Sequence, residues 1–420
     1  MKTVFYGWRV VAAVFVLAVF GWGMGFYGPP VYLHAVREAR GWPLPLVSAA
    51  VTAHYLVGAL VVANLPALYR RFGVATVTKA GALSLGLGVC GWALAAAPWQ
   101  LFVATMLSGA GWVTLGAAAV NQIVSPWFVR MRPAALAMAY NGASVGGIVL
   151  APLWVTAIGL FGFLFAAAGI GAVMLVTIWM LSDRVFGRTP QQMGLTPDGD
   201  ALGAPSPAVT SPAARPLPGR LLWRDFAFLT LAAAMALGLF AQVGLLTHLF
   251  SLLVPALGAQ WAGLAMGAAT AAAITGRTLF GWLMPAGADR RLVACVSYSV
   301  QIAGLIAFVL AAGQSVPLLL LGVVLFGLGI GNATSLPPLI CQVEFVKDDV
   351  PRAVALMVAI AQASYAFAPA AFGLIREFAP RATDAAPGSA PYFYVAVALV
   401  QALAIGAFLL RRSVRKRIAA

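Results

Sequence analysis

Long apolar segments separated by short polar stretches form the main pattern along the chain. About 20 apolar residues are needed to cross the ~30 Å hydrocarbon core of a bilayer, and the sequence contains twelve segments of that kind. They lie at residues 8–34, 44–68, 74–96, 99–125, 133–157, 160–182, 224–253, 259–284, 292–312, 315–341, 352–375 and 391–411. The pattern therefore predicts an all-α membrane protein with twelve transmembrane helices.

One charged residue interrupts this pattern in the eighth segment. From Ala268 to Met284 the chain is apolar or uncharged except for Arg277. A charge inside a span is unfavourable by at least ~2.5–3.5 kcal/mol, so such a residue usually faces a cavity, a partner or an ion path. All eleven acidic residues fall in loops or at the ends of segments. A bound anion is the simplest partner. The alternatives are an arginine satisfied by helix carbonyls, or one that extends to the membrane edge.

Composition supports the membrane class and excludes several others. Charged residues make up 9% of the 420 residues and hydrophobic residues 62%, whereas a soluble domain is ~25% charged. The net charge of +15 comes from basic residues in short loops, a distribution that argues against nucleic-acid binding. The three cysteines lie in or at the ends of spans and give no disulfide or metal pattern. The sequence offers no nucleophile–base set and no nucleotide loop, so we expect no enzyme, no cofactor and no metal site.

The distribution of lysine and arginine predicts the orientation. If both termini are cytoplasmic, the cytoplasmic segments carry 21 basic residues and the opposite segments carry four. The positive-inside rule then places both termini in the cytoplasm. The protein is expected to be a multi-pass protein of the inner (plasma) membrane.

A proline-rich stretch divides the chain into two halves. We expect a six-helix bundle at residues 1–182, a cytoplasmic linker at 183–223, and a second six-helix bundle with a basic tail at 224–420. A shift of 220 residues aligns Arg70-Arg71 with Arg290-Arg291, and Gly109-x-Gly111 with Gly329-x-Gly331. Parallel repeats of this kind place a substrate site near the membrane midplane between the halves.

These features resemble the major facilitator superfamily, over nearly the whole chain. Three stretches are similar to its monocarboxylate-porter and oxalate/formate-antiporter branch: WFVRMRP leading into ALAMAYNGASVGG, then PQQMGLTPDG, and Gly276-Arg277 with Gly281. In that branch an arginine of the eighth span binds a carboxylate. The resemblance implies a secondary transporter that moves a small organic anion of monocarboxylate type by alternating access, coupled to protons or to exchange of another anion.

Several positions depart from the patterns of these relatives. Tyr69 stands where the loop after the second span usually has an aspartate, and Ala273 stands where animal-type monocarboxylate porters carry one. The lysine of their first span is absent as well, so their proton-coupling route is not reproduced. Oxalate-type antiporters add a second cation in the eleventh span, where this chain has Gln362 and Tyr365. A single arginine balances one carboxylate, which favours a monoanion.

The remaining candidates are polar or aromatic residues within the spans. The predicted substrate-binding residues are Arg277, His54, Trp22, Tyr27, Tyr140, Asn141, Gln242, Asn332, Gln362 and Tyr365. His54 is also the candidate for proton coupling. The gate candidates are His248, Arg70, Arg71, Asp289 and Arg290. Structural alternatives remain open: a histidine bonded to a neighbouring helix, a packed Trp22, and an interhelical hydrogen bond from Gln242.

Two other functions share this fold. An exporter of drugs or other small organic compounds usually needs an acidic residue within the membrane, and the spans contain none. A transporter-like sensor would signal to a partner, but the chain shows no additional domain. We expect a monomer in the lipid bilayer, with a small organic anion and protons as its ligands and no nucleic-acid partner.

Overall fold

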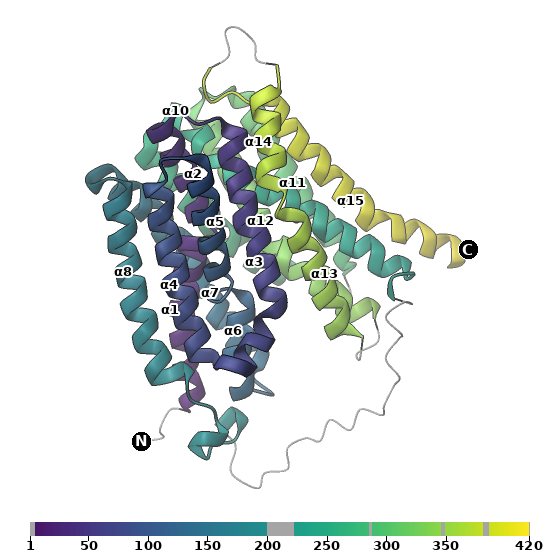
Figure 1. Cartoon of the computed structure of the whole chain (residues 1–420). Helices are drawn as coiled ribbons and strands as arrows, with labels where there is room; N and C mark the ends of the chain where they lie inside the picture. The colour runs from purple at the N-terminus through teal and green to yellow at the C-terminus, as the bar shows by residue number, and fades with distance from the viewer. Residues whose placement is uncertain (1–4, 200–221, 285–287, 346–348, 381–385, 420) are drawn as a thin grey trace. The chain divides into compact units, whose positions relative to one another are not determined.

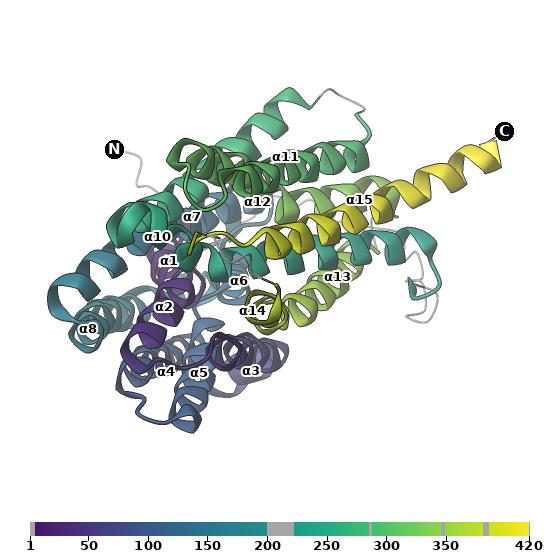
Figure 2. The same cartoon turned by 90° about the horizontal axis from the view of Figure 1, so that it is seen from above.

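The chain folds into helices arranged as two separate bundles. The computed structural model describes residues 5–199, 222–284, 288–345, 349–380 and 386–419, and within these ranges it contains helices and turns but no strand. The chain divides into two compact units, Met1–Thr210 and Ser211–Ala420. In each unit the helices run alongside one another (Figures 1 and 2). The predicted all-α membrane fold is confirmed.

The N-terminal unit is built from eight helices. They are α1 (Tyr6–Gly25), α2 (Gly28–Arg40), α3 (Leu44–Phe72), α4 (Val74–Leu94), α5 (Pro98–Trp112), α6 (Ala117–Val124), α7 (Arg132–Phe161) and α8 (Phe163–Leu181). Four short helical turns complete the described part of this unit: η1 (Ser125–Trp127), η2 (Ser182–Phe186), η3 (Gln191–Met193) and η4 (Pro197–Gly199).

The C-terminal unit contains longer helices. They are α10 (Phe226–Leu283), α11 (Arg290–Ala311), α12 (Val316–Glu344), α13 (Val350–Tyr365), α14 (Ala368–Phe378) and α15 (Pro391–Ala419). Within this unit α12 packs against α10 and α11, and α10 also packs against α13 and α15.

Helix α10 contains two of the twelve predicted spans. Its 58 residues would measure about 87 Å as one straight helix, far more than the ~30 Å hydrocarbon core. The helix is broken at Gly258, whose φ of 75° and ψ of 162° are not helical. That region is nearly exclusive to glycine. The described residues include eleven helical segments that are long and apolar enough to cross a membrane, with α10 counted once, so the break at Gly258 accounts for the twelfth.

Three predicted spans are interrupted rather than continuous. The first is split into α1 and α2 at Phe26–Tyr27, the fourth into α5 and α6 at 113–116, and the eleventh into α13 and α14 at Ala366–Phe367. Prolines stand in the first turn of both α2 and α14. A proline is tolerated there because the first N–H groups of a helix have no partner within it.

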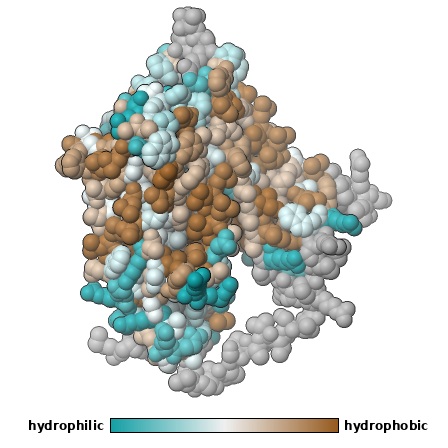
Figure 3. Space-filling view, in the orientation of Figure 1, coloured by the Kyte–Doolittle hydropathy of each residue, from teal (hydrophilic) through white to brown (hydrophobic). Residues whose placement is uncertain are grey.

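The outer faces of the bundles are apolar. Leu160, Phe165 and Leu310 are among the large side chains that are two-thirds or more exposed. Figure 3 shows apolar residues over the flanks of the helices, and hydrophilic residues gathered at the lower end of the N-terminal unit. Such a surface suits contact with lipid.

Some sequence-based expectations fall outside the described residues. They concern most of the linker (200–221), the basic residues Lys2, Lys347 and Arg381, and the side chains of the tail from Arg411 onward.

Candidate functional site

Arg277 lies in the second half of α10, where this helix meets α12. Its neighbour Gly276 comes so close to α12 that an added Cβ would lie 1.9 Å from the carbonyl oxygen of Leu328. A residue with a side chain therefore cannot occupy position 276 without separating the two helices. The Nε of the half-buried Arg277 donates to the carbonyl oxygen of Gly331 at 3.4 Å. This contact ties the Nε end of the guanidinium to α12.

The part of α12 beside Arg277 is rich in polar groups. Thr334 and Ser335 donate their hydroxyl hydrogens to the same Gly331 carbonyl, at 3.2 and 3.0 Å. Pro337 and Pro338 lie inside α12 and have no N–H to offer the carbonyls four residues earlier. The predicted residue Asn332 is buried here, with its Nδ2 3.4 Å from the Leu328 carbonyl. The structure therefore brings Asn332 into the turn of α12 that faces Arg277.

A second polar group lies in the N-terminal unit and includes two predicted residues. The rings of Trp22 and Tyr140 meet edge to face at 6.1 Å. The Tyr140 hydroxyl donates to the Ala117 carbonyl at 3.0 Å, and Asn121 binds both this hydroxyl and the same carbonyl. Asn121 was not among the predicted site residues. The signal was present, since Asn121 belongs to a polar Asn-Gln pair inside a span.

Two further predicted residues lie near this group in the sequence. Asn141 follows Tyr140 on α7 and is exposed. Tyr27 lies at the break between α1 and α2, where its half-buried ring meets the ring of Phe26 at 5.1 Å. The assignment of both residues to the site stays a prediction.

His54 is fully buried and both of its ring nitrogens have partners within the N-terminal unit. Nε2 lies 2.9 Å from the Gly25 carbonyl, which can only accept, so this nitrogen carries a hydrogen. Nδ1 lies 2.8 Å from the Ser108 hydroxyl, and the ring stacks on Trp112 at 5.6 Å. These contacts match a histidine bonded to neighbouring helices. Its proposed role in proton coupling stays a prediction.

Gln242 forms an interhelical hydrogen bond, which was the structural alternative to its predicted role in substrate binding. Its Nε2 donates to Oε1 of Gln301 on α11 at 3.0 Å, and Gln401 on α15 donates to the same oxygen at 2.6 Å. All three amides are buried. Gln242 is thus part of the core of the C-terminal unit in this structure. The other two polar candidates, Gln362 and Tyr365, are half-buried on α13, which packs against α10 and α12.

The predicted gate residue His248 links α10 to α14. Its Nε2 donates to the Pro369 carbonyl at 3.0 Å, and its Nδ1 lies 3.4 Å from Nη1 of Arg376. Arg376 also donates to the Ser251 hydroxyl at 2.7 Å. These contacts join α10 to α14 at the end of the C-terminal unit that lies opposite to the start of α10.

The Asp289-Arg290-Arg291 sequence fixes the other end of the C-terminal unit. Asp289 caps α11 by accepting from the backbone N–H of Arg291 at 3.0 Å, and Arg290 donates to the Leu339 carbonyl. Arg291 was not among the predicted gate residues, yet it forms a two-bond ion pair with Glu344 at 2.7 and 2.9 Å. By contrast, the corresponding Arg70 and Arg71 of the N-terminal unit are exposed, and Arg71 lies 5.1 Å from the Phe72 ring.

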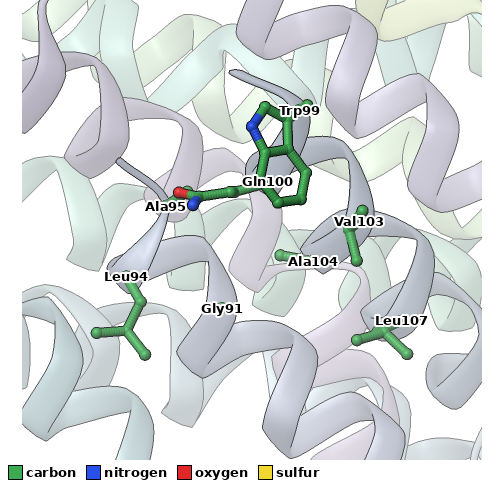
Figure 4. A pocket seen from close by; sticks show the side chains of 8 residues that line it. All are labelled: Gly91, Leu94, Ala95, Trp99, Gln100, Val103, Ala104 and Leu107. Carbon is green, nitrogen blue, oxygen red and sulfur yellow. The ribbon is translucent and has the colours of Figure 1, made fainter. Parts of the chain in front are cut away.

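An apolar groove of about 270 Å³ lies elsewhere, on the α4–α5 face of the N-terminal unit. Figure 4 shows Leu94 on one side and Trp99, Val103 and Leu107 on the other. The polar Oε1 of Gln100 is used to accept from the backbone N–H groups of Ala96 and Ala97. The groove contains none of the predicted site residues and no charged group, so it is not the candidate substrate site.

Comparison with known proteins identifies a family and a fold. The family described as Major Facilitator Superfamily matches residues 11–369. No curated protein matches the chain. A bacterial homologue of the human lysosomal transporter Spinster, inward-facing and occupied, is 14% identical with a TM-score of 0.72, covering 97% of each chain. A D-xylose–proton symporter is 13% identical with a TM-score of 0.70, covering 96% of this chain and 97% of its own. The nucleoside transporter NupG is 12% identical with a TM-score of 0.68, covering 98% and 99%. At these identities the solved structures show a shared fold.

Proposed function

The chain belongs to the major facilitator superfamily, and from this premise we propose that it moves a small organic anion of monocarboxylate type. It is a multi-pass transporter of the plasma membrane and not an enzyme. The proposed mechanism is alternating access, with Arg277 as the receptor for the substrate carboxylate. Coupling is to a proton or to exchange of a second anion.

The observation that supports this proposal is the setting of Arg277. The residue is the one charge in an apolar stretch, and such a charge is costly unless it serves a ligand or a partner. Its Nε contacts a main-chain carbonyl of α12, which limits the orientations open to the planar guanidinium. A guanidinium binds carboxylate through two parallel N–H bonds and stays charged at every relevant pH. Arg277 is thus a permanent receptor for one negative charge.

In the N-terminal unit, the Trp22–Tyr140–Asn121 group supplies further candidate ligand contacts. Aromatic faces can cover the apolar part of a small carboxylate, and the amide of Asn121 can bind a hydroxyl or keto oxygen.

Direction and coupling follow from the membrane potential. Moving an anion inward against an inside-negative potential costs ~2.3 kcal/mol per charge per 100 mV, so uptake needs a co-transported proton or an exchanged anion. His54 is the proposed proton carrier. With its hydrogen on Nε2, the neutral ring has one acceptor, Nδ1, which lies 2.8 Å from the Ser108 hydroxyl. Ser108 can also donate to the Thr105 carbonyl at 3.0 Å, so a protonated Nδ1 can donate to the Ser108 oxygen while the hydroxyl hydrogen goes to Thr105. The proton thus has a defined position and a defined partner.

The test is ligand-induced stabilisation of purified protein. Wild type, Arg277→Ala and Arg277→Lys are melted with a panel of aliphatic and aromatic monocarboxylates, with dicarboxylates, and with neutral and cationic compounds. A ligand at 100 times its Kd stabilises the folded state by ~2.7 kcal/mol. Some monocarboxylates should stabilise the wild type and not Arg277→Ala. The lysine variant should respond weakly, because its ammonium cannot form the two-bond contact.

Arg352→Ala is the matched control, since it removes one positive charge from an exposed position at the start of α13 in the same unit. It should keep the wild-type response. If Arg277→Ala is stabilised by the same carboxylates as the wild type, Arg277 is not the receptor. If only neutral or cationic compounds stabilise the protein, the proposal of an organic-anion substrate is wrong and the result favours the exporter alternative.

A further inference from the structure

Two sequence motifs that the proposed function does not use lie against each other in the N-terminal unit. One is the Pro197-Asp198-Gly199 turn at the start of the linker, and the other is the turn between α6 and α7. The Asp198 carboxylate accepts from three consecutive backbone N–H groups of that second turn: Val129 at 3.1 Å, Arg130 at 2.8 Å and Met131 at 3.2 Å. The linker therefore supplies the acceptor for a turn nearly 70 residues earlier in the chain.

The α6–α7 turn depends on charged side chains for its main-chain hydrogen bonds. Helix α7 starts at Arg132, and Met131 before it provides no side-chain cap. Arg132 instead donates from Nε to the Phe128 carbonyl at 2.9 Å and from Nη2 to the Ser125 carbonyl at 3.2 Å. A cation thus satisfies the carbonyls of the turn while the Asp198 anion satisfies its N–H groups, so loss of either leaves main-chain groups without their partners.

The linker turn has two consecutive residues with positive φ. Asp198 has a φ of 61°, one of two positive values among the described non-glycine residues. Gly199 follows with a φ of 73°, and its Cα lies so near the Phe5 ring that an added Cβ would be 2.8 Å away. A backbone of this kind persists where surrounding contacts determine it. The contacts here come from the start of α1 and from the α6–α7 turn.

Aromatic side chains complete the same contact region. Phe5 meets the ring of Trp127 at 6.3 Å and that of Phe128 at 5.6 Å, both edge to face. Trp8 on α1 lies 5.1 Å from Phe128. The first residues of α1, the turn before α7 and the linker turn thus form one packed cluster.

We propose that the linker segment Gln191–Gly199 is a latch, which Asp198 seats on the α6–α7 turn and which fixes the start of α7 against the start of α1. Asp198 acts as a positioning residue and contacts no substrate. The inference is independent of which molecule is transported.

Hydrogen exchange measured by mass spectrometry on the full chain tests the latch. Asp198→Ala removes the carboxylate, and Asp200→Asn is the control that removes a negative charge two residues later. In Asp198→Ala we expect the amides of Val129, Arg130 and Met131 to exchange about tenfold faster or more, together with faster exchange in the first turns of α1 and α7. Asp200→Asn should exchange like the wild type.

A second variant keeps the test decisive if Asp198→Ala does not fold. Val129→Pro removes one of the three donors and leaves Asp198 in place, and Phe128 already has the extended backbone (φ −137°, ψ 136°) that a following proline favours. It should speed exchange in residues 191–199. Unchanged exchange at 129–131 in Asp198→Ala would overturn the proposal. Faster exchange there with no change at the starts of α1 and α7 would also overturn it, because Asp198 would then be only a local cap.

Discussion

The ion pair between Arg291 and Glu344 offers a sharp prediction about stability. Arg291 is 2% exposed and donates to five acceptors: both Glu344 carboxylate oxygens, the Thr230 hydroxyl, and the carbonyls of Ala227 and Phe408. These contacts tie α11 to α10, α12 and α15. The change Glu344→Gln keeps the shape of the side chain and removes its charge, so the guanidinium stays buried without a counter-charge.

The expected loss can be estimated from this geometry. Breaking a buried pair by removing one partner costs ~3–5 kcal/mol. We expect the lower end, about 3 kcal/mol, because three neutral acceptors remain and Glu344 is 16% exposed. For a domain of 150–250 residues this loss lowers the melting temperature by about 6–12 °C. Removing both charges, in Arg291→Met with Glu344→Leu, should restore most of the stability, since apolar replacement of a buried pair is often neutral.

The assay is the melting temperature of purified protein, read as the loss of the monodisperse peak on size-exclusion chromatography after heating. Arg71→Ala is the control, because Arg71 stands in the corresponding position of the N-terminal unit and is exposed. It should change stability by less than about 0.5 kcal/mol. The smallest shift expected for Glu344→Gln is about 6 °C. A melting temperature within about 2 °C of the wild type, or a double variant less stable than Glu344→Gln, would show that the ion pair does not stabilise the unit in this way.

Three further outcomes follow from the structure. Gly258→Ala forces a side chain into a backbone region nearly exclusive to glycine and should lower the free energy of unfolding by about 1–3 kcal/mol in the same melting assay. The control is Gly406→Ala, inside α15, where no atom lies within 4 Å of the new Cβ. This variant should be neutral or slightly stabilising. Gly276→Ala places a Cβ 1.9 Å from the Leu328 carbonyl and should abolish the carboxylate-induced stabilisation, because Arg277 moves away from Gly331; a wild-type response would contradict this. Burial raises the pKa of the Asp198 carboxyl. Hydrogen bonds from Arg130, Met131 and Val129, together with the Arg130 charge, lower it by more than burial raises it, so the pKa of Asp198 lies below its ordinary value. Docking of the latch should therefore be complete above pH ~3.9 and be lost only as the pH falls through the lowered pKa. Exchange at residues 129–131, corrected for its intrinsic pH dependence, should be the same at pH 7 and pH 5.

Sequence patterns predicted the spans well because lipid imposes a simple rule on them. The segments expected at 44–68 and 292–312 are observed as Leu44–Phe72 and Arg290–Ala311. The breaks inside spans were harder to locate. Prolines indicated those before α2 and α14, but the break at 113–116 contains no proline, and hydrophobicity does not change there. Backbone breaks of this kind depend on neighbouring helices, which a hydropathy pattern does not contain.

The sequence predicted a site residue clearly only where that residue is unusual by itself. Arg277 stands out as a charge in an apolar segment. The sequence around Gln242 does not indicate its hydrogen-bond partners, because Gln301 and Gln401 belong to two other helices, 59 and 159 positions later in the chain. The same holds for His54, whose partners Gly25 and Ser108 lie on different elements. Whether a buried polar residue binds its own protein or a ligand is decided by tertiary contacts.

The single-residue reversal at Gly258 has a mechanical consequence for α10. The two arms of α10, before and after Gly258, are joined by only one non-helical residue. So short a connection cannot extend, and neither arm can slide along the other. They can only pivot about Gly258. The contact of His248 with Pro369 holds the first arm to α14 ten residues before Gly258, so a tilt of the arm that carries Arg277 is taken up at Gly258 and leaves this contact in place. Gly258 is therefore a hinge, at which the arm that carries Arg277 can change its tilt without any lengthening of the chain between the two arms.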